Sequence, residues 1–405
     1  MTTSFSGIYS SLTGLLGFST ALDVTSENIS NLNTPGFKSN ETLFRDLGSF
    51  QAGNGPKFGS FEEAIGQGVA VEGQVRNFAE GQIQSTGNPT DLAINGSGFF
   101  ILQAGNQLEF TRAGQFSFDS TGHLIDSASN LHVQAIGTDG KLSDLVVDQA
   151  QKFAATPTTT VKFSNALSTG QSGAFNLGNI TVVDASGASQ TLSASFTRDT
   201  SNPSSSAIVW DVTVTDSKNN TLATGKIQFN PTQEAQPGFD TLSVVVPTAD
   251  KRSSVVTFDF SDAVSNSSGA SSNLQVENSN GIPSGTLTSL AFDANGVVQL
   301  SFSNGKTQTG AQIALASFAN PQLLAENGNA SFVIPRGSTL QPTLGHAGEA
   351  GFGTLQPQSI ELANVDLGQE FANIIVLQRG YQGSSQVLNV SSQLLDTLYN
   401  ALSHK

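Results

Sequence analysis

Residues 367–402 read LGQEFANIIVLQRGYQGSSQVLNVSSQLLDTLYNAL, and this stretch decides the fold of the chain. Within it an apolar side chain returns at every seventh residue: Leu367, Ile374, Tyr381, Leu388, Leu395 and Leu402. A seven-residue apolar period predicts a helix with one narrow apolar seam, as in coiled coils. Because such a seam is unstable in water, the helix needs another helix to cover it.

The beginning of the chain carries the same period. Its apolar residues also stand seven positions apart: Ile8, Leu15, Leu22 and Ile29. We expect a helix from residue 1 to about residue 33, because the residue before Pro35 avoids helical backbone angles. Three glycines each weaken this helix by up to about 1 kcal/mol, so we expect it to be marginal on its own. They are Gly7, Gly14 and Gly17.

We interpret the two seams as partners of each other, or of copies of the same chain. The alternative is that each end is an ordinary amphipathic helix packed on a globular core. The last helix should begin between Asn364 and Asp366. Asn364 is its candidate cap, and Asp366 and Glu370 lie in its first turns, where the helix dipole favours acids.

The sequence between the two ends has the two-residue period of strands. Residues 285–318 alternate around Asn295-Gly296 and Asn304-Gly305, which predicts two hairpins. Residues 98–136 are similar, and residues 150–280, richer in Ser, Thr and Asn, read as a separate inserted β domain. The sequence therefore predicts a multidomain α+β fold, with the terminal helices paired as a coiled coil and nested β-rich domains between them.

We expect six segments along the chain, arranged so that both ends contribute to one inner domain. They are an N-terminal helix (1–35), a connecting segment (36–75), the first half of an inner β domain (76–148), an inserted outer β domain (149–282), the second half of the inner β domain (283–357), and a connecting segment with the C-terminal helix (358–405).

Composition excludes several classes of function. The formal net charge of -15 argues against binding to nucleic acid or anionic lipid, which needs clustered Lys and Arg. Cysteine is absent, which excludes disulfides, thiolate metal sites and a cysteine nucleophile. No run of about 18 apolar residues occurs, so we expect no membrane span. The first basic residue is Lys38, so we expect no cleaved signal peptide.

No constellation of catalytic residues stands out. The histidines have no metal-binding spacing on one helix face, and we expect them at the surface or in turns. They are His123, His132, His346 and His404. The chain has neither a phosphate-binding loop motif nor a nucleophile-elbow motif. We therefore expect a protein that is not an enzyme and holds no cofactor and no metal.

Three segments together resemble a known family. They are residues 26–38 (SENISNLNTPGFK), residues 86–116 (TGNPTDLAINGSGFF leading to FTRAGQF) and residues 359–382 (SIELANVDL leading to QRGYQ). In this order they resemble the axial proteins of the bacterial flagellum, which comprise rod and hook subunits. The resemblance covers roughly half of the chain, at both ends and in the first β segment.

Rod subunits of this pattern are shorter, so the inserted domain makes the chain resemble hook subunits. The resemblance implies an open helical polymer outside the cell, a flexible tubular joint that links the basal-body rod to the filament, transmits torque and encloses the export channel. Implied partners are further copies of the chain, distal rod and hook–filament junction proteins, and the hook cap. A rod or hook-associated subunit, and a secreted β-rich adhesin with a helical stalk, remain alternatives.

Two groups of residues are candidates for assembly. The first is the self-assembly seam, the ten heptad residues of the two ends. The second is the family-motif turn, formed by Asn28, Asn31, Asn33, Thr34, Pro35, Gly36 and Phe37. Asn and Thr side chains there can bond backbone groups at the helix end, Gly36 can adopt positive φ, and Phe37 is a candidate anchor for a neighbouring surface. A purely local turn is the alternative.

Overall fold

The computed structural model describes residues 2–51, 64–66, 68–137, 139–201, 207–248, 253–266 and 271–403. The chain forms two compact units. The first is built from Met1–Asp148, Leu290–Gln299 and Thr309–Lys405, and the second from Gln149–Ser289 and Leu300–Gln308. The range expected for the inserted domain, 149–282, falls within the second unit.

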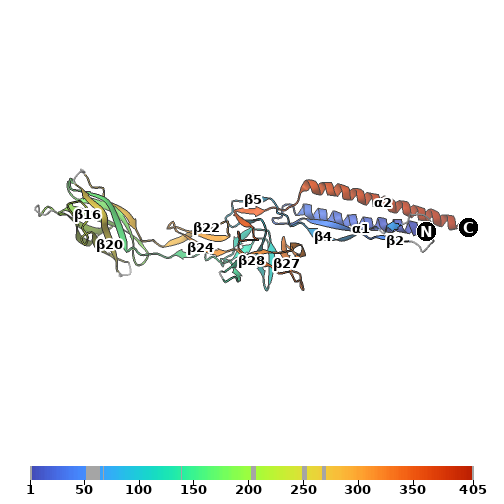
Figure 1. Cartoon of the computed structure of the whole chain (residues 1–405), viewed down its shortest axis with the longest axis horizontal. Coiled ribbons are helices and arrows are strands. Elements are labelled where there is room, and N and C mark those ends of the chain that lie inside the picture. The colour runs from blue at the N-terminus through green and yellow to red at the C-terminus, as the bar shows by residue number, and fades with distance from the viewer. Residues whose placement is uncertain are drawn as a thin grey trace. The chain divides into compact units, whose positions relative to one another are not determined.

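Two long helices lie side by side and antiparallel in the first unit (Figure 1). They are α1 (Thr2–Ser30) and α2 (Leu367–Ser403). α1 ends slightly earlier than expected, and at Asn31 the backbone N–H is shared between the carbonyls of Glu27 and Asn28 as the helix gives way to a turn. Neither of these helices, over the residues described, is both long and apolar enough to cross a membrane.

The helix α2 is capped by Asp366, so the expected cap at Asn364 is wrong. Asp366 Oδ1 accepts hydrogen bonds from the backbone N–H groups of Gly368 (2.7 Å) and Gln369 (3.1 Å). Asn364 is engaged elsewhere, because its Oδ1 accepts a bond from Ser39 N (2.7 Å). Its amide therefore fastens the segment before α2 to the segment after α1.

The expected connecting segment 36–75 contains strands that pack on α1. β1 (Asn40–Asp46) pairs antiparallel with β4 (Val69–Arg76), and β2 (Ser49–Gln51) pairs antiparallel with β3 (Ala64–Gly66). Phe44 on β1 faces the helix, with its ring centroid 6.0 Å from that of Phe18. Residues 52–63 and 67 of this segment lie outside the described residues.

The body of the first unit is a ten-stranded sheet. Seven strands follow the order β26-β27-β8-β7-β11-β10-β9, while β12 pairs with β11, and β25 pairs with β7 and β28. The strands are β7 (Phe99–Ala104), β8 (Gln107–Thr111), β9 (Phe116–Phe118), β10 (Leu124–Asp126), β11 (His132–Ile136), β12 (Leu142–Asp144), β25 (Leu315–Ser317), β26 (Ala325–Gly328), β27 (Ser331–Val333) and β28 (Thr343–Gly345).

Phenylalanine rings fill one face of this sheet. Phe110 and Phe318 meet edge to face with centroids 4.8 Å apart, and Phe99 packs against both Phe318 and Phe332. Two small strand pairs lead from this sheet toward the helices. They are β6 (Leu92–Asn95) with β29 (Thr354–Pro357), and β5 (Ile83–Ser85) with β30 (Ser359–Glu361).

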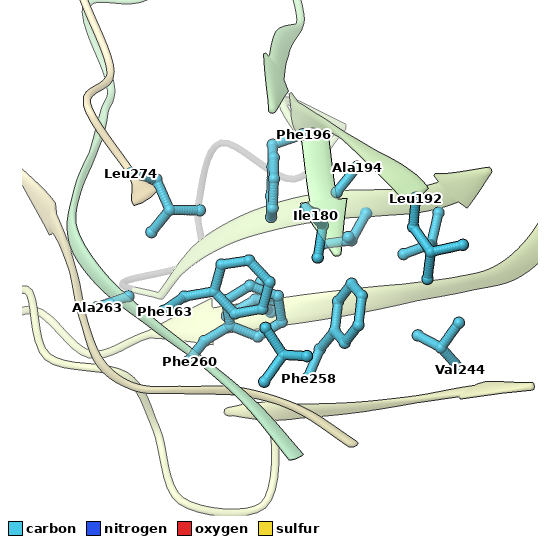
Figure 2. Packing of buried hydrophobic residues seen from close by; sticks show 14 of the residues in the cluster. Phe163, Ile180, Leu192, Ala194, Phe196, Val244, Phe258, Phe260, Ala263 and Leu274 are labelled. Carbon is cyan, nitrogen blue, oxygen red and sulfur yellow. The ribbon is translucent and has the colours of Figure 1, made fainter. Parts of the chain in front are cut away.

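The second unit contains two four-stranded sheets with a shared core, ordered β19-β20-β14-β21 and β15-β16-β17-β18. Their strands are β14 (Thr160–Ser168), β15 (Phe175–Val183), β16 (Ser189–Arg198), β17 (Ile208–Asp216), β18 (Thr221–Phe229), β19 (Thr241–Pro247), β20 (Ser253–Asn266) and β21 (Gln275–Ser279). Figure 2 shows Phe163, Phe258 and Phe260 pointing into the space where Phe196 and Leu192 also lie. The single tryptophan of the chain, Trp210, is buried in this core.

The two predicted Asn-Gly hairpins are confirmed. The strands β22 (Gly285–Phe292), β23 (Val297–Phe302) and β24 (Thr307–Gln312) form a four-stranded sheet with β13 (Lys152–Phe153). Gly296 and Gly305 have φ of +76° and +72°, the left-handed backbone that glycine adopts without a steric penalty. A short 3₁₀ helix, η1 (Pro321–Leu323), follows β25.

Candidate assembly site

The two helices meet through small side chains. The residues of α1 that are buried form one stripe: Ser11, Gly14, Gly17, Ala21, Val24, Thr25 and Asn28. A Cβ atom added at Gly14 would lie 2.9 Å from Ser384 Oγ on α2, and one added at Gly380 would lie 2.6 Å from the ring of Phe18. Glycine and serine therefore let the helix backbones approach closely.

The large apolar residues of the predicted seam flank this contact. Ile8, Leu15, Leu22 and Ile29 are each half-buried, and in α1 the buried stripe runs one position earlier, through Gly14, Ala21 and Asn28. On α2 the half-buried seam residues are Ile374, Leu388 and Leu395, whereas Leu367 and Tyr381 are exposed. The side chain of Leu402 lies outside the described residues. The period located the helices but not the line along which they touch, because a period of large side chains does not show how small residues pack.

The helix pair leaves many large apolar side chains open to solvent, and we call these side chains together its open apolar face. Its members on α2 are Phe371, Ile375, Val376, Val387, Val390, Leu394 and Tyr399, and those on α1 are Tyr9, Leu12 and Leu16. Val376 is 67% exposed and Ile375 is 60% exposed. Large apolar side chains exposed in such number on two neighbouring helices indicate an interaction surface. The heptad pattern missed most of this face, since these residues fall between its seam positions.

The family-motif turn begins with a buried asparagine that joins three segments. Asn28 Nδ2 donates to Asn40 O and to Glu370 Oε1, both at 2.9 Å, and Asn28 Oδ1 accepts from Asn40 N at 2.9 Å. Asn28 and Glu370 are both nearly inaccessible to solvent. Asn28 thus fixes the end of α1 to the first turn of α2 and to β1.

The rest of the turn closes against its own unit. Gly36 has φ of +71°, as predicted, and its N–H donates to Glu361 O at 2.8 Å. A Cβ there would lie 2.3 Å from Ala113 N, so no other residue fits. Phe37 is 4% exposed in the single chain, and its predicted role as an anchor for a neighbouring surface is therefore wrong.

The remaining motif residues are more open. Asn31 Nδ2 donates to Glu27 O at 3.0 Å, which satisfies a carbonyl at the helix end, and Thr34 Oγ1 donates to Asn31 Oδ1 at 3.1 Å. Pro35 is half-buried and Asn33 is exposed. The structure therefore gives the motif turn mainly a local role, as the tie between α1 and the sheet body.

A buried charge cluster lies directly behind this turn. Glu361, the last residue of β30, forms ion pairs with Lys38 through Oε1 and with Arg112 through Oε2, the latter at 3.2 Å. Glu361 Oε1 also accepts the N–H of Gly81 at 2.8 Å. All three charged side chains are buried, and Glu361 is fully inaccessible. The cluster joins the exit of α1, the end of β8 and the approach to α2.

The two cations also donate hydrogen bonds to backbone carbonyls, although the buried Nε of Arg112 has no partner. Lys38 Nζ donates to Ala79 O at 2.7 Å, and Arg112 Nη2 donates to Gly96 O at 2.7 Å. Burial lowers the pKa of Lys38, and the attraction of Glu361 opposes this shift. The sequence did not point to this cluster, because Lys38 and Glu361 stand far apart in the chain. The available signal was that each of the three family-like segments contributes one of its charges.

The close approach of the helices predicts opposite effects for two glycines of α2. Gly380→Ala should destabilise the first unit by about 1–3 kcal/mol, because the new methyl group meets the ring of Phe18, which also packs against Phe44. Gly383→Ala, with no atom within 4 Å of its new Cβ, should instead stabilise the helix by about 1 kcal/mol. Urea unfolding followed by far-UV circular dichroism measures both, and equal shifts in the two variants would contradict the close approach.

Three family models match the chain where these elements lie. "Flagella basal body rod protein" matches residues 8–38, "Flagellar hook protein FlgE/F/G D1 domain" matches residues 93–157, and "Flagellar basal body rod FlgEFG protein C-terminal" matches residues 356–401. The first contains most of α1 and the motif turn, the second contains β7 to β12, and the third contains β30 and most of α2.

Relatives match along nearly the whole chain. The flagellar hook protein FlgE of Borreliella burgdorferi is 30% identical over 439 residues, which cover 96% of this chain and 98% of that protein. FlgE proteins of Salmonella typhimurium and Escherichia coli are each 29% identical with the same coverage. The crystal structure of Helicobacter pylori flagellar hook protein FlgE2 gives a TM-score of 0.44 at 14% identity, covering 69% of this chain and 100% of that one.

Proposed function

Because this chain belongs to the flagellar hook protein family, we infer that it is a structural subunit of the bacterial flagellar hook. The alignments that support this assignment span 96% of the chain, so they extend over both compact units and not only over the two helices. We propose that many copies form a tubular joint that links the rod to the filament, transmits torque and encloses an export channel. No chemical step is assigned to it.

The open apolar face of the helix pair carries this proposal. A single chain leaves large side chains such as Ile375 and Val376 in water along the length of α2. Each Å² of such surface buried against further copies stabilises the assembly by about 25 cal/mol. Burial of this surface would therefore drive assembly without any charged contact. A face that runs along an extended helix suits repeated head-to-tail stacking, which yields an open polymer and not a closed ring.

Within that polymer we propose that the helix pair, residues 1–35 and 358–405, forms the inner domain of the tube as a coiled coil. The ten heptad residues would then contact helices of neighbouring copies, since the intramolecular contact leaves most of them half-buried or exposed. We assign the segments 76–148 and 283–357 to an inner β domain and 149–282 to an outer one. The further partners of the polymer are then distal rod and hook–filament junction proteins and, during assembly, a cap. We propose that the chain is exported without a cleaved signal peptide.

A rod or hook-associated subunit is the second candidate. The family models that match residues 8–38 and 356–401 are both named for basal body rod proteins, and they cover the two helices. The hook assignment is preferred because relatives named as hook proteins also match the second unit.

Electron microscopy of polymers grown from the purified full chain tests the assignment. We expect hollow tubes with variable curvature. Uniformly straight tubes would favour the rod assignment, and closed oligomers of fixed mass, or a chain that stays monomeric at high concentration, would contradict both.

A further inference from the structure

Two histidines that are separate in the sequence stack on each other in the first unit. His123 precedes β10 and His132 begins β11, and their rings lie 4.5 Å apart between centroids with an angle of 15° between the planes. The pairing of β10 with β11, in which Ile125 stands opposite His132, brings the rings together. Both side chains are partly exposed, so a solute can reach them.

Two carboxylates stand at this histidine pair. Asp144 Oδ2 lies 2.8 Å from His132 Nδ1, and Asp119 Oδ2 lies 3.7 Å from His123 Nδ1. One ligand atom from each of Asp119, His123 and His132 can be chosen so that all lie within 4.8 Å of one another. Within the part of the chain that the structure describes, these three side chains therefore lie close enough together to hold one metal ion.

The carboxylates are held in the charged form. Hydrogen bonds from Thr121 lower the pKa of Asp119. Burial alone raises the pKa of Asp144, but hydrogen bonds from Gln134 and His132 outweigh it and leave that pKa below its ordinary value. An aspartate is anionic near neutral pH even at its ordinary pKa, so both side chains offer anionic oxygen whatever these shifts are.

We propose that His123, His132 and Asp119 bind a divalent transition-metal ion of the zinc class, with Asp144 orienting His132. Imidazole nitrogen and carboxylate oxygen are the ligands that zinc, cobalt and nickel take in proteins. A metal-binding histidine commonly has its second ring nitrogen held by a carboxylate, which is the relation of His132 to Asp144. Binding requires the near-parallel rings to tilt toward each other, which their partial exposure permits.

The ion would fasten the turn between β9 and β10 to the first residue of β11. Three protein ligands leave a coordination position for water, since a tetrahedral zinc site has four. The effect on this chain is structural, because the ion adds a link between neighbouring strands of the ten-stranded sheet. This inference does not depend on the hook assignment.

The chain contains a matched control for this site. His346 Nδ1 lies 3.0 Å from Glu349 Oε1, so it has the same imidazole–carboxylate pairing, and no second histidine is grouped with it in the described part of the chain. A site that depends on the stacked pair should be insensitive to His346→Asn.

Titration of the untagged, chelator-treated full chain with Zn²⁺ in a calorimeter, and with Co²⁺ followed by visible absorption, tests the proposal. We expect one saturable site per chain and a Co²⁺ spectrum typical of low coordination number. H123N and H132N should each weaken binding by about 10-fold or more, whereas H346N should leave it unchanged. Zn²⁺ should also raise the thermal midpoint of the wild-type chain and not that of H132N.

Two results would overturn the proposal. One is the absence of saturable Zn²⁺ or Co²⁺ binding by the wild-type chain. The other is binding of undiminished affinity by the double variant H123N/H132N, with circular dichroism showing that the variant is folded, since the metal would then sit elsewhere.

Discussion

Replacing Glu361 with alanine is expected to lower the free energy of unfolding of the first unit by about 3–5 kcal/mol. The substitution leaves two buried cations, Lys38 and Arg112, without their counter-ion, and it leaves Gly81 N–H without its acceptor. Urea unfolding followed by far-UV circular dichroism measures the loss. Fluorescence of Trp210 reports the second unit alone, so its transition should stay in place.

Glu326→Ala is the matched control for Glu361→Ala. Glu326 forms an ion pair with Arg76 in the same unit, but its side chain is 33% exposed, and such pairs contribute about 0–1 kcal/mol. If both alanine variants lose the same stability, the buried cluster has no special role in holding the unit together. If the tryptophan transition shifts with Glu361→Ala, the effect is not confined to the first unit.

The second large effect is expected on assembly and not on folding. Ile375→Asp places a charge in the middle of the open apolar face of α2, at a side chain that is 60% exposed in the single chain. The monomer should keep its stability, whereas burying that charge between copies costs at least about 2 kcal/mol and raises the concentration needed for polymerisation by about 30-fold or more. Sedimentation of polymers over a range of protein concentrations measures the threshold.

Gln378→Asp provides the control on the same helix. It adds the same charge at an exposed position that is already polar, so no apolar side chain is lost. We expect its polymerisation threshold to stay close to that of the wild-type chain. Normal polymers from Ile375→Asp, or equal loss in both variants, would count against this face as the assembly surface.

The sequence predicts best where a local pattern has one structural meaning. The seven-residue periods located both terminal helices, since few other structures require that spacing. Asn295-Gly296 and Asn304-Gly305 located two hairpin turns, because glycine there needs positive φ. The strand β4 was missed, although Val69, Val71 and Val75 alternate in it, because the surrounding loop-like composition hid the pattern.

Features that depend on distant residues could not be predicted in this way. The line of contact between α1 and α2 is set by Gly14 and Gly380 meeting side chains of the other helix, and no pattern within one helix reveals such a fit. The charge cluster shares this property, since only the folded chain brings Lys38, Arg112 and Glu361 together from three distant segments. Reading Phe37 as an anchor failed for the same reason, because its burial comes from its own unit.

The position of Glu361 has a mechanical consequence. Its side chain holds Lys38, and its carbonyl holds Gly36, so the exit of α1 is fastened to the residue from which the chain continues into α2. Both bonds join the same two segments, so a pull on either helix loads them together. Bonds loaded in parallel share the strain, so the two helices should keep their alignment when one of them is pulled, and replacing the Glu361 side chain should lower the load at which α1 slips past α2.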